Sequence, residues 1–485
     1  MSIKKAAMLN MGGKYTVIIL NLFVSAILAR LLTPEEYGIV AIVTVFTSFF
    51  NILADFGVGN AIVQNQTLSK EDIQNIFSWS LERSLLLGVA FLLLAVPISL
   101  FYSDYVYLKI VPLLAISVVF SASNMIPNAL LMKKKKFGLI AMRSIVVCIV
   151  CAIITILLAY LGASYYALVV NSIIFSFLNL VWNMKNSELK LFKVVGDKKV
   201  SINKVKNFSS NVFKFNVINY FSRNLDNLLI GKFMGTAMLG YYNKAYTLML
   251  YPMNNFTNVI TPVLLPFLAD KKDDKKFIYG KYLETVRVLS LLGIYITVFC
   301  LFSSYELVGI LFGEKWILTV PCFQLLAVSI WSQMICATSG PMFQLLDRTR
   351  TQFRRGLIAV GTTVSCILIG VLFNNIETVS LFVTLAYLSN FVTMLIFLVK
   401  RSFGESCLKY LKQFIPDLII GLGVGVSLYL IGLLNIENIV ISFSLKLVVS
   451  AIVYLVMLFV TKQYKHLLKY IPNKIIKKFR FLIVK

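Results

Sequence analysis

The sequence predicts an all-α polytopic membrane protein with about fourteen transmembrane helices. Apolar residues make up 59% of the 485 residues, more than the roughly 45 to 50% apolar content of soluble domains. The mean hydropathy is +0.83. Apolar runs of about 20 residues, the length that a helix needs to cross a bilayer, recur along the whole chain. Charged residues make up only 14% of the chain and cluster between these runs, so the net charge of +26 does not indicate a nucleic-acid-binding protein.

The first six predicted spans follow an N-terminal segment that has no small-residue cleavage site, so we expect the first helix to stay uncleaved. Each span is an apolar run bounded by a short polar or basic connection. The six spans are 13–32, 38–63, 78–102, 110–132, 138–161 and 164–184. A longer basic connection separates them from the rest of the chain.

Eight more spans follow that connection, and a basic tail ends the chain. The eight spans are 209–231, 240–268, 282–302, 318–346, 356–373, 378–399, 416–434 and 439–461. In the tail, apolar residues sit among lysines, which predicts an amphipathic helix at the membrane surface. These apolar residues are Leu467, Leu468, Ile471, Ile475, Ile476 and Phe479.

The Lys and Arg residues between the spans predict the orientation, because cations accumulate on the cytoplasmic side of a membrane protein. With fourteen spans, one side of the membrane holds all the basic clusters, including Lys133 to Lys136 and both ends of the chain. The connections on the opposite side carry only Lys109, Lys232 and Lys315. We therefore expect a multi-pass membrane protein with both termini in the cytoplasm.

The sequence also contains an internal repeat. Leu28 to Gly38 matches Ile230 to Gly240, with a cation and a glycine eight residues apart in both segments, and Leu113-Leu-Ala-Ile-Ser117 matches Leu325-Leu-Ala-Val-Ser329. The repeat predicts two parallel, pseudo-symmetric six-helix lobes with a C-terminal helix pair. The predicted parts are an N-lobe (1–190), a basic cytoplasmic linker (191–208), a C-lobe (209–400), the segment of helices thirteen and fourteen (401–461) and the tail (462–485).

Six motifs resemble those of a known family. They are Ile27-Leu-Ala-Arg-Leu-Leu-Thr-Pro-Glu-Glu-Tyr-Gly38, Asp55-Phe-Gly57, Ala61-Ile-Val-Gln64, Asn227-Leu-Leu-Ile-Gly-Lys232, Leu239-Gly-Tyr-Tyr-Asn-Lys-Ala245 and Leu311-Phe-Gly-Glu-Lys-Trp316. In their order and spacing, the sequence resembles the Wzx-type polysaccharide flippases of the multidrug, oligosaccharidyl-lipid and polysaccharide exporter superfamily.

The resemblance covers most of the chain and implies a fold and a function. The implied fold is a V-shaped, MATE-like pair of lobes around a central cavity. The implied function is export of undecaprenyl-pyrophosphate-linked oligosaccharide repeat units by alternating access, for capsule, exopolysaccharide, O-antigen (lipopolysaccharide) or teichuronic-type polymers.

Cations inside apolar spans are candidates for the substrate site, because each costs roughly 2.5 to 3.5 kcal/mol to insert at a helix centre. Arg30, Arg223 and Lys244 are the first candidates, since the resemblance places their helices around the cavity, where they would hold an anionic headgroup. Lys14 and Lys214 are further candidates. Asp55 and Asp226 are candidates for coupling transport to H+ or Na+.

Structural interpretations compete with these assignments. The side chains of Lys14 and Lys446 are long enough to extend to the membrane surface. Arg223 is placed to pair with Asp226 three residues later. Arg30 is near a helix end, where it could contact an outer-leaflet headgroup. Asn51 and Asn60 near Asp55 equally favour helix packing. Cytoplasmic structural ion pairs are expected at the inner ends of equivalent helices, between Glu82 and Arg83 and between Glu284 and Arg287.

Three other function classes compete with this interpretation. An enzyme is disfavoured, because the outer connections are short, the sole histidine, His466, is in the tail, and no phosphate-binding G-x-x-x-x-G-K-[ST] loop is present. An ion-coupled multidrug extruder of the same superfamily would need an acidic or aromatic cavity, whereas cations outnumber carboxylates here. A peptidoglycan-precursor flippase is chemically close and stays an alternative.

The expected ligands and partners follow from the first interpretation. They are a lipid-linked oligosaccharide, membrane lipids and, outside the chain itself, a polysaccharide polymerase and its chain-length machinery. No catalytic residue, metal site, nucleic acid or cofactor is expected, apart from H+ or Na+ as a coupling ion.

Overall fold

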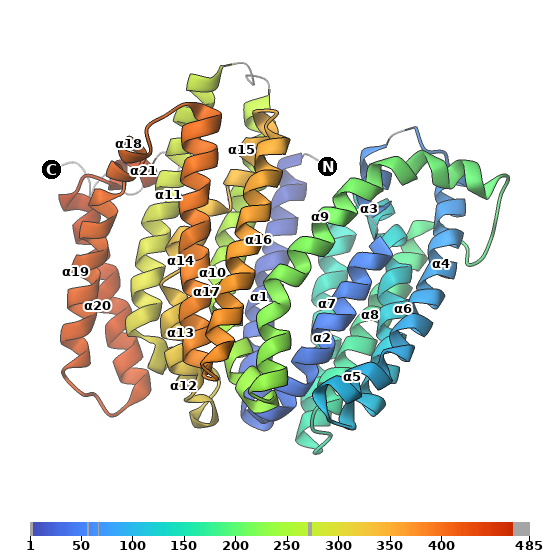
Figure 1. Cartoon of the computed structure of the whole chain (residues 1–485), viewed down its shortest axis with the longest axis horizontal. Coiled ribbons are helices and arrows are strands. Elements are labelled where there is room, and N and C mark those ends of the chain that lie inside the picture. The colour runs from blue at the N-terminus through green and yellow to red at the C-terminus, as the bar shows by residue number, and fades with distance from the viewer. Residues whose placement is uncertain (1–2, 56–57, 66, 270–273, 469–485) are drawn as a thin grey trace. The chain divides into compact units, whose positions relative to one another are not determined.

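A computed structural model of the protein describes residues 3–55, 58–65, 67–269 and 274–468 (Figure 1). Within this part of the chain the regular structure is helical and contains no strand, which confirms the predicted all-α class. The chain divides into two compact units, residues 1–240 and 241–485. Each unit is described by itself below.

The first unit contains nine helices in the described residues and the first turn of a tenth. They are α1 (Ile3–Leu31), α2 (Pro34–Asp55), α3 (Val58–Gln64), α4 (Lys70–Leu93), α5 (Ala95–Tyr102), α6 (Val106–Lys133), α7 (Phe137–Tyr160), α8 (Tyr166–Ser187), α9 (Lys198–Phe233) and the start of α10 (Thr236–Ala269). Within the unit, α6 packs on α4 and α8, α1 packs on α7, and α9 packs on α2 and α4.

Local sequence explains where two of these helices begin. α2 starts at Pro34, a position where the missing N–H costs no helical hydrogen bond, and the Thr33 amide donates to Glu36 Oε2 at 2.6 Å. α4 starts with a capping box, in which Ser69 Oγ accepts from the Asp72 amide and Asp72 Oδ2 accepts from the Ser69 amide, both at 3.0 Å.

The second unit continues α10 and holds the remaining described helices. They are α11 (Lys275–Phe302), α12 (Ser304–Leu311), the short η1 (Glu314–Trp316), α13 (Thr319–Ala327), α14 (Ile330–Cys336), α15 (Ser339–Leu345), α16 (Thr349–Leu372), α17 (Ile376–Met394), the π-helical η2 (Leu395–Phe403), α18 (Cys407–Lys412), α19 (Ile415–Gly432), α20 (Ile439–Val460) and α21 (Tyr464–Leu468). α11 packs on α13, α14 and α19, and α19 packs on α20 (Figure 1).

The predicted spans coincide with these helices but are less continuous than the sequence suggested. The tenth predicted span, 318–346, is broken into α13, α14 and α15 with a bend of 47°. Span 78–102 is interrupted at Leu94 between α4 and α5. Eleven helices in the described residues are long and apolar enough to cross a membrane, or twelve if the bent segment is one span. The total of fourteen spans stays a prediction, because parts of α9 and α10 carry side chains that the structure does not describe.

The boundaries predicted from the repeat also stay a prediction. Contacts divide the chain after Gly240, whereas the repeat divides it in the basic linker 191–208. α9 begins at Lys198, inside that linker, and packs on helices of the first unit.

Candidate functional site

Lys244, one of the three first candidates, lies in an aromatic cage of the second unit. Its Nζ is 4.9 Å from the ring centroid of Phe312 and 5.6 Å from that of Trp316. The Tyr241 ring packs edge-on against the Trp316 ring, with their centroids 6.0 Å apart. Lys244 is 6% exposed and Trp316 is fully buried. The structure thus brings together two motifs, 239–245 and 311–316, that are about 70 residues apart in the sequence, and cation–π attraction holds the ammonium between them.

The other candidate cations lie in the first unit. Arg30 is exposed in the last turn of α1, Arg223 is exposed on α9, and Lys14 is exposed near the start of the first apolar run. Lys214 belongs to α9, and its side chain lies outside the described part of the structure. The assignment of these cations to a headgroup site therefore stays a prediction.

The two candidate acids have different surroundings. Asp55 is the last residue of α2, and its Oδ1 accepts a hydrogen bond from the Gly59 amide at 3.2 Å, next to the break between α2 and α3. Asp226 on α9 is 2% exposed, and its Oδ1 accepts from the Asn227 amide at 2.8 Å. A capping role explains the first contact, and neither contact tests ion coupling. In the described residues, no group of three or more Cys, His, Asp or Glu side chains could hold a metal ion.

The repeated motif around Gly38 and Gly240 forms a reciprocal contact. A Cβ added to Gly38 would clash with the backbone carbonyl of Thr236, and a Cβ added to Gly240 would clash with that of Pro34. Pro34 and Thr236 occupy matching positions of the repeat, four residues before the two glycines. The first turns of α2 and α10 are therefore in backbone contact through equivalent residues, and this contact needs glycine at both positions.

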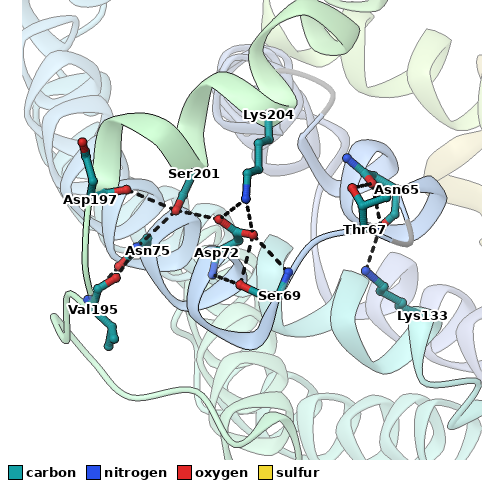
Figure 2. A network of polar contacts seen from close by, with 10 residues as sticks. All are labelled: Asn65, Thr67, Ser69, Asp72, Asn75, Lys133, Val195, Asp197, Ser201 and Lys204. Atoms are coloured by element: carbon teal, nitrogen blue, oxygen red, sulfur yellow. Dashed lines mark hydrogen bonds and ion pairs between the residues drawn. The ribbon is translucent and has the colours of Figure 1, made fainter.

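A polar network fastens the connection before α9 to α4 (Figure 2). The Asn75 amide group donates to the Val195 carbonyl at 2.6 Å and accepts from the Val195 amide at 2.8 Å. Asp72 accepts from Ser201 Oγ at 2.9 Å and forms an ion pair with Lys204 at 2.7 Å. The capping box of α4 thus also positions the first turns of α9, a function that its local sequence does not reveal.

Buried charges of the second unit correct two sequence-based expectations. Arg287 pairs with Asp417 on α19 at 2.9 Å rather than with Glu284, which pairs with Lys281 at 2.9 Å. Lys446, for which extension to the membrane surface was one interpretation, forms a buried ion pair with Glu306 at 2.5 Å.

The first unit corrects the third expectation. Glu82 pairs with Lys198 at 2.5 Å, and Arg83 lies 4.6 Å from the Trp79 ring centroid. Partners more than 100 residues away are not visible in the local charge pattern.

Sequence analysis missed two arginines that the structure places inside helix bundles. Arg143 on α7 is 9% exposed, and its Nη1 donates to Asn128 and Asn183 Oδ1, both at 2.8 Å. Arg355 on α16 is half-buried and donates to Ser339 Oγ at 3.2 Å. A cation inside an apolar span was the available signal for Arg143. Arg355 was assigned to a connection, because its helix begins earlier than predicted.

Comparisons with known proteins agree with the fold. A family model described as "Polysaccharide biosynthesis protein" matches residues 27–321. An uncharacterized membrane protein in the cps region of Klebsiella pneumoniae is 22% identical and aligns over 97% of this chain and 96% of its own length. The lipopolysaccharide biosynthesis protein WzxC of Escherichia coli (strain K12) is 22% identical over 85% of this chain and 86% of its own length.

Among solved structures, the lipid II flippase MurJ in an inward closed conformation is similar with a TM-score of 0.76 and 16% identity. The match covers 95% of this chain and 100% of that protein. At this identity the likeness concerns the fold.

Proposed function

Because the chain belongs to the polysaccharide biosynthesis protein family, we propose that it is a flippase that moves undecaprenyl-pyrophosphate-linked oligosaccharide across the bacterial plasma membrane. The polymer would be a capsule, exopolysaccharide, O-antigen or teichuronic-type polysaccharide. The protein itself is a multi-pass membrane protein, and transport rather than catalysis is its proposed role. Both termini would lie in the cytoplasm, beside the basic connections.

The observation that carries this proposal is the family match over residues 27–321, which includes all of α2 to α12. A relative named for lipopolysaccharide biosynthesis aligns over most of the chain, which supports a substrate from that chemistry. The cationic side chains on the helices support an anionic headgroup, because guanidinium and ammonium groups bind phosphate oxygens.

We assign headgroup binding to Arg30, Arg223 and Lys244, with Lys14 and Lys214 as secondary contacts. Arg30 and Arg223 are exposed residues, which suits contact with a ligand. Lys244 would have to leave its aromatic cage, or act from within it through its positive field. Asp55 and Asp226 are the proposed groups for coupling to H+ or Na+.

Alternating access requires a contact that closes one end of the transport path and can separate. The reciprocal contact of Gly38 and Gly240 suits this role, because glycine lets two helix starts approach closely without interlocked side chains. We propose that this contact separates when the cavity opens on the side of the first connection.

The test is transport of a fluorescent undecaprenyl-pyrophosphate oligosaccharide in proteoliposomes that contain the full chain. We expect the wild type to move it, and a variant with Arg30→Gln, Arg223→Gln and Lys244→Gln to be slower by about tenfold or more, since a lost charged contact costs at least about 1.4 kcal/mol. Lys109→Gln, which removes an exposed cation in the first turn of α6, is the matched control and should retain the wild-type rate. An equal rate for the triple variant would contradict the site assignment.

The fold likeness to MurJ favours one second candidate, a peptidoglycan-precursor flippase. A parallel reaction with lipid II decides between the two substrates. Faster transport of lipid II than of every polysaccharide intermediate would replace the proposed function, and efflux of organic cations without any lipid transport would indicate a multidrug extruder. Imposed H+ and Na+ gradients in the same vesicles test the coupling ion.

A further inference from the structure

Arg143 and Arg355 occupy equivalent positions in the two halves of the repeat. Each is the seventh residue of a 24-residue helix, α7 and α16 respectively. They are 212 residues apart, the same separation as Leu113 and Leu325 of the repeated Leu-Leu-Ala motif. Basic residues stand at the start of each helix, Lys133 to Lys136 just before α7 and Arg348 with Arg350 at the beginning of α16.

The neighbours of the two arginines are also equivalent. Arg143 contacts Asn128 on α6, the preceding helix, and Asn183 on α8, the following helix. Arg355 contacts Ser339 on α15, which precedes its helix, and its Nη2 donates to the Asn390 carbonyl on α17, which follows, at 3.4 Å. Each arginine thus bridges the helix before it and the helix after it.

Neither guanidinium group has a negatively charged partner in the part of the chain that the structure describes. All the acceptors of both groups are neutral, namely two side-chain amides, one hydroxyl and one backbone carbonyl. In both residues the buried Nε has no hydrogen-bond acceptor. Arg287, by contrast, is buried to a similar degree as Arg143 and pairs with Asp417.

Both guanidinium groups therefore lack a counter-charge and a hydrogen-bond acceptor for Nε among the described residues. A guanidinium group has five N–H donors and a permanent charge, and burying such a charge without a counter-charge is costly. Water can satisfy the remaining donors but not the charge. An oxyanion satisfies both, because two of its oxygens accept parallel hydrogen bonds from the planar guanidinium group.

The position of the arginines favours an anion carried by a lipid. The seventh residue of a helix is about 9 Å along the axis from the first, so each guanidinium group lies at the edge of the hydrocarbon region if the basic connection lies at the membrane surface. Lipid phosphates lie at that surface, and a long Arg side chain reaches toward them.

We propose that Arg143 and Arg355 form two equivalent sites, one in each half of the repeat, for the phosphate-type oxyanion of a lipid headgroup. The identity of the lipid as the carrier of the oligosaccharide rests on the proposed function, whereas the anion itself rests on the contacts above. A membrane phospholipid presents the same phosphate chemistry, so the experiment separates the two sources.

The experiment counts lipids bound to the purified full chain by native mass spectrometry. The probes are undecaprenyl pyrophosphate, phosphatidylglycerol and diacylglycerol, which has no phosphate. We expect phosphate-bearing lipids to bind and diacylglycerol not to bind. Arg143→Gln and Arg355→Gln should each remove one bound lipid, because the affinity of the altered site falls by about tenfold or more. The double variant should remove two. Arg354→Gln, an exposed neighbour on the same helix, should bind like the wild type.

A second variant distinguishes anion binding from simple bridging of helices. Asn128 accepts from Arg143 through Oδ1, and its amide nitrogen has only a weak contact with Met132 Sδ at 3.9 Å. Asn128→Asp therefore supplies a carboxylate to Arg143 without losing a strong hydrogen bond. We expect the thermal midpoint to stay at or above the wild-type value while one lipid is lost, because the new carboxylate takes the place of the anion.

The lipid that binds identifies the kind of site. A preference for undecaprenyl pyrophosphate identifies the sites as substrate sites, and equal binding of phosphatidylglycerol identifies them as phospholipid sites. Full lipid binding by Asn128→Asp or by the double arginine variant, or equal binding of diacylglycerol, would overturn the proposal. Binding is measured without transport, so an inactive wild type in proteoliposomes would contradict the proposed function and leave this result intact.

Discussion

The two units of the molecule place their ion pairs at different depths. In the first unit, each of the three ion pairs between described residues has at least one partner whose side chain is 40% exposed or more: Lys204–Asp72 (42% and 7%), Lys198–Glu82 (23% and 53%) and Lys134–Glu188 (30% and 67%). In the second unit, two of the three ion pairs between described residues, Arg287–Asp417 (6% and 0%) and Lys446–Glu306 (9% and 6%), are buried, and Lys281–Glu284 (37% and 32%) is partly exposed.

The difference corresponds to what each set of ion pairs connects. Two exposed pairs of the first unit join the first turns of α9 to α4, and Figure 2 shows one of them, Lys204–Asp72; the third joins Lys134 and Glu188, just after α6 and α8. The buried pairs join the C-terminal hairpin α19–α20 to α11 and α12 at its two ends, since Asp417 lies near the start of α19 and Lys446 near the start of α20. A charge inside a bundle therefore has a structural role where a carboxylate accompanies it. Among the described residues Arg143 has no carboxylate partner, which separates it from Arg287.

Removing the carboxylate from Arg287 should have the largest effect. Asp417→Asn leaves Arg287 buried without a counter-charge, and we expect a loss of about 3 to 5 kcal/mol in the free energy of unfolding. The measurement is thermal or denaturant unfolding of the detergent-purified chain. Glu377→Gln, an exposed carboxylate at the start of α17, is the control and should unfold like the wild type. An unchanged midpoint for Asp417→Asn would show that Arg287 does not need its partner.

Breaking the second buried pair should cost less. In Lys446→Met, Glu306 loses the ammonium but keeps the hydrogen bond from Ser442 Oγ at 2.8 Å, so we expect a loss of roughly 2 to 3 kcal/mol in the same assay. The double variant Lys446→Met with Glu306→Gln removes both charges and should recover most of that loss. If the double variant is as unstable as the single one, packing rather than charge holds α20.

The network around Asp72 should show a smaller and more local effect. Asp72→Ala removes one half of the capping box and the partner of Lys204, and we expect a loss of about 1 to 2 kcal/mol. Amide hydrogen exchange should increase in residues 190–204, because their contacts with α4 depend on this end of the helix. Glu71→Ala changes an exposed neighbour and serves as the control. Faster exchange along the whole chain would instead indicate global destabilisation.

The exposed pair of Lys134 and Glu188 should have the smallest effect. Glu188→Gln should leave the unfolding midpoint unchanged within the error of the measurement, since both side chains reach solvent. The nearby Lys134 lowers the pKa of Glu188. Any contribution of the pair is therefore present at neutral pH and is lost as the pH falls through that lowered pKa. A clear shift of the midpoint at pH 7 would remove the proposed difference between exposed and buried pairs.

The sequence by itself determined the all-α membrane class of the protein and the approximate positions of its long apolar helices. A bilayer imposes one local requirement on each span, about 20 apolar residues whose backbone bonds close within a helix, and this requirement is visible without any tertiary contact. The repeat was visible for the same reason, since equivalent helices keep similar residues in the same order. The family resemblance came from motifs that are continuous in the chain, and the match over residues 27–321 confirms it.

Only the tertiary structure decided which charges meet. Arg287 and Asp417 are 130 residues apart, and Lys198 and Glu82 are 116 residues apart, so no local pattern distinguishes these partners from the near neighbours Glu284 and Arg83. The cage around Lys244, the breaks in the tenth span and the equivalence of Arg143 and Arg355 likewise depend on how the helices pack. Apolar spans arise from a residue's own segment, whereas the partner of a buried charge is set by the neighbouring helix.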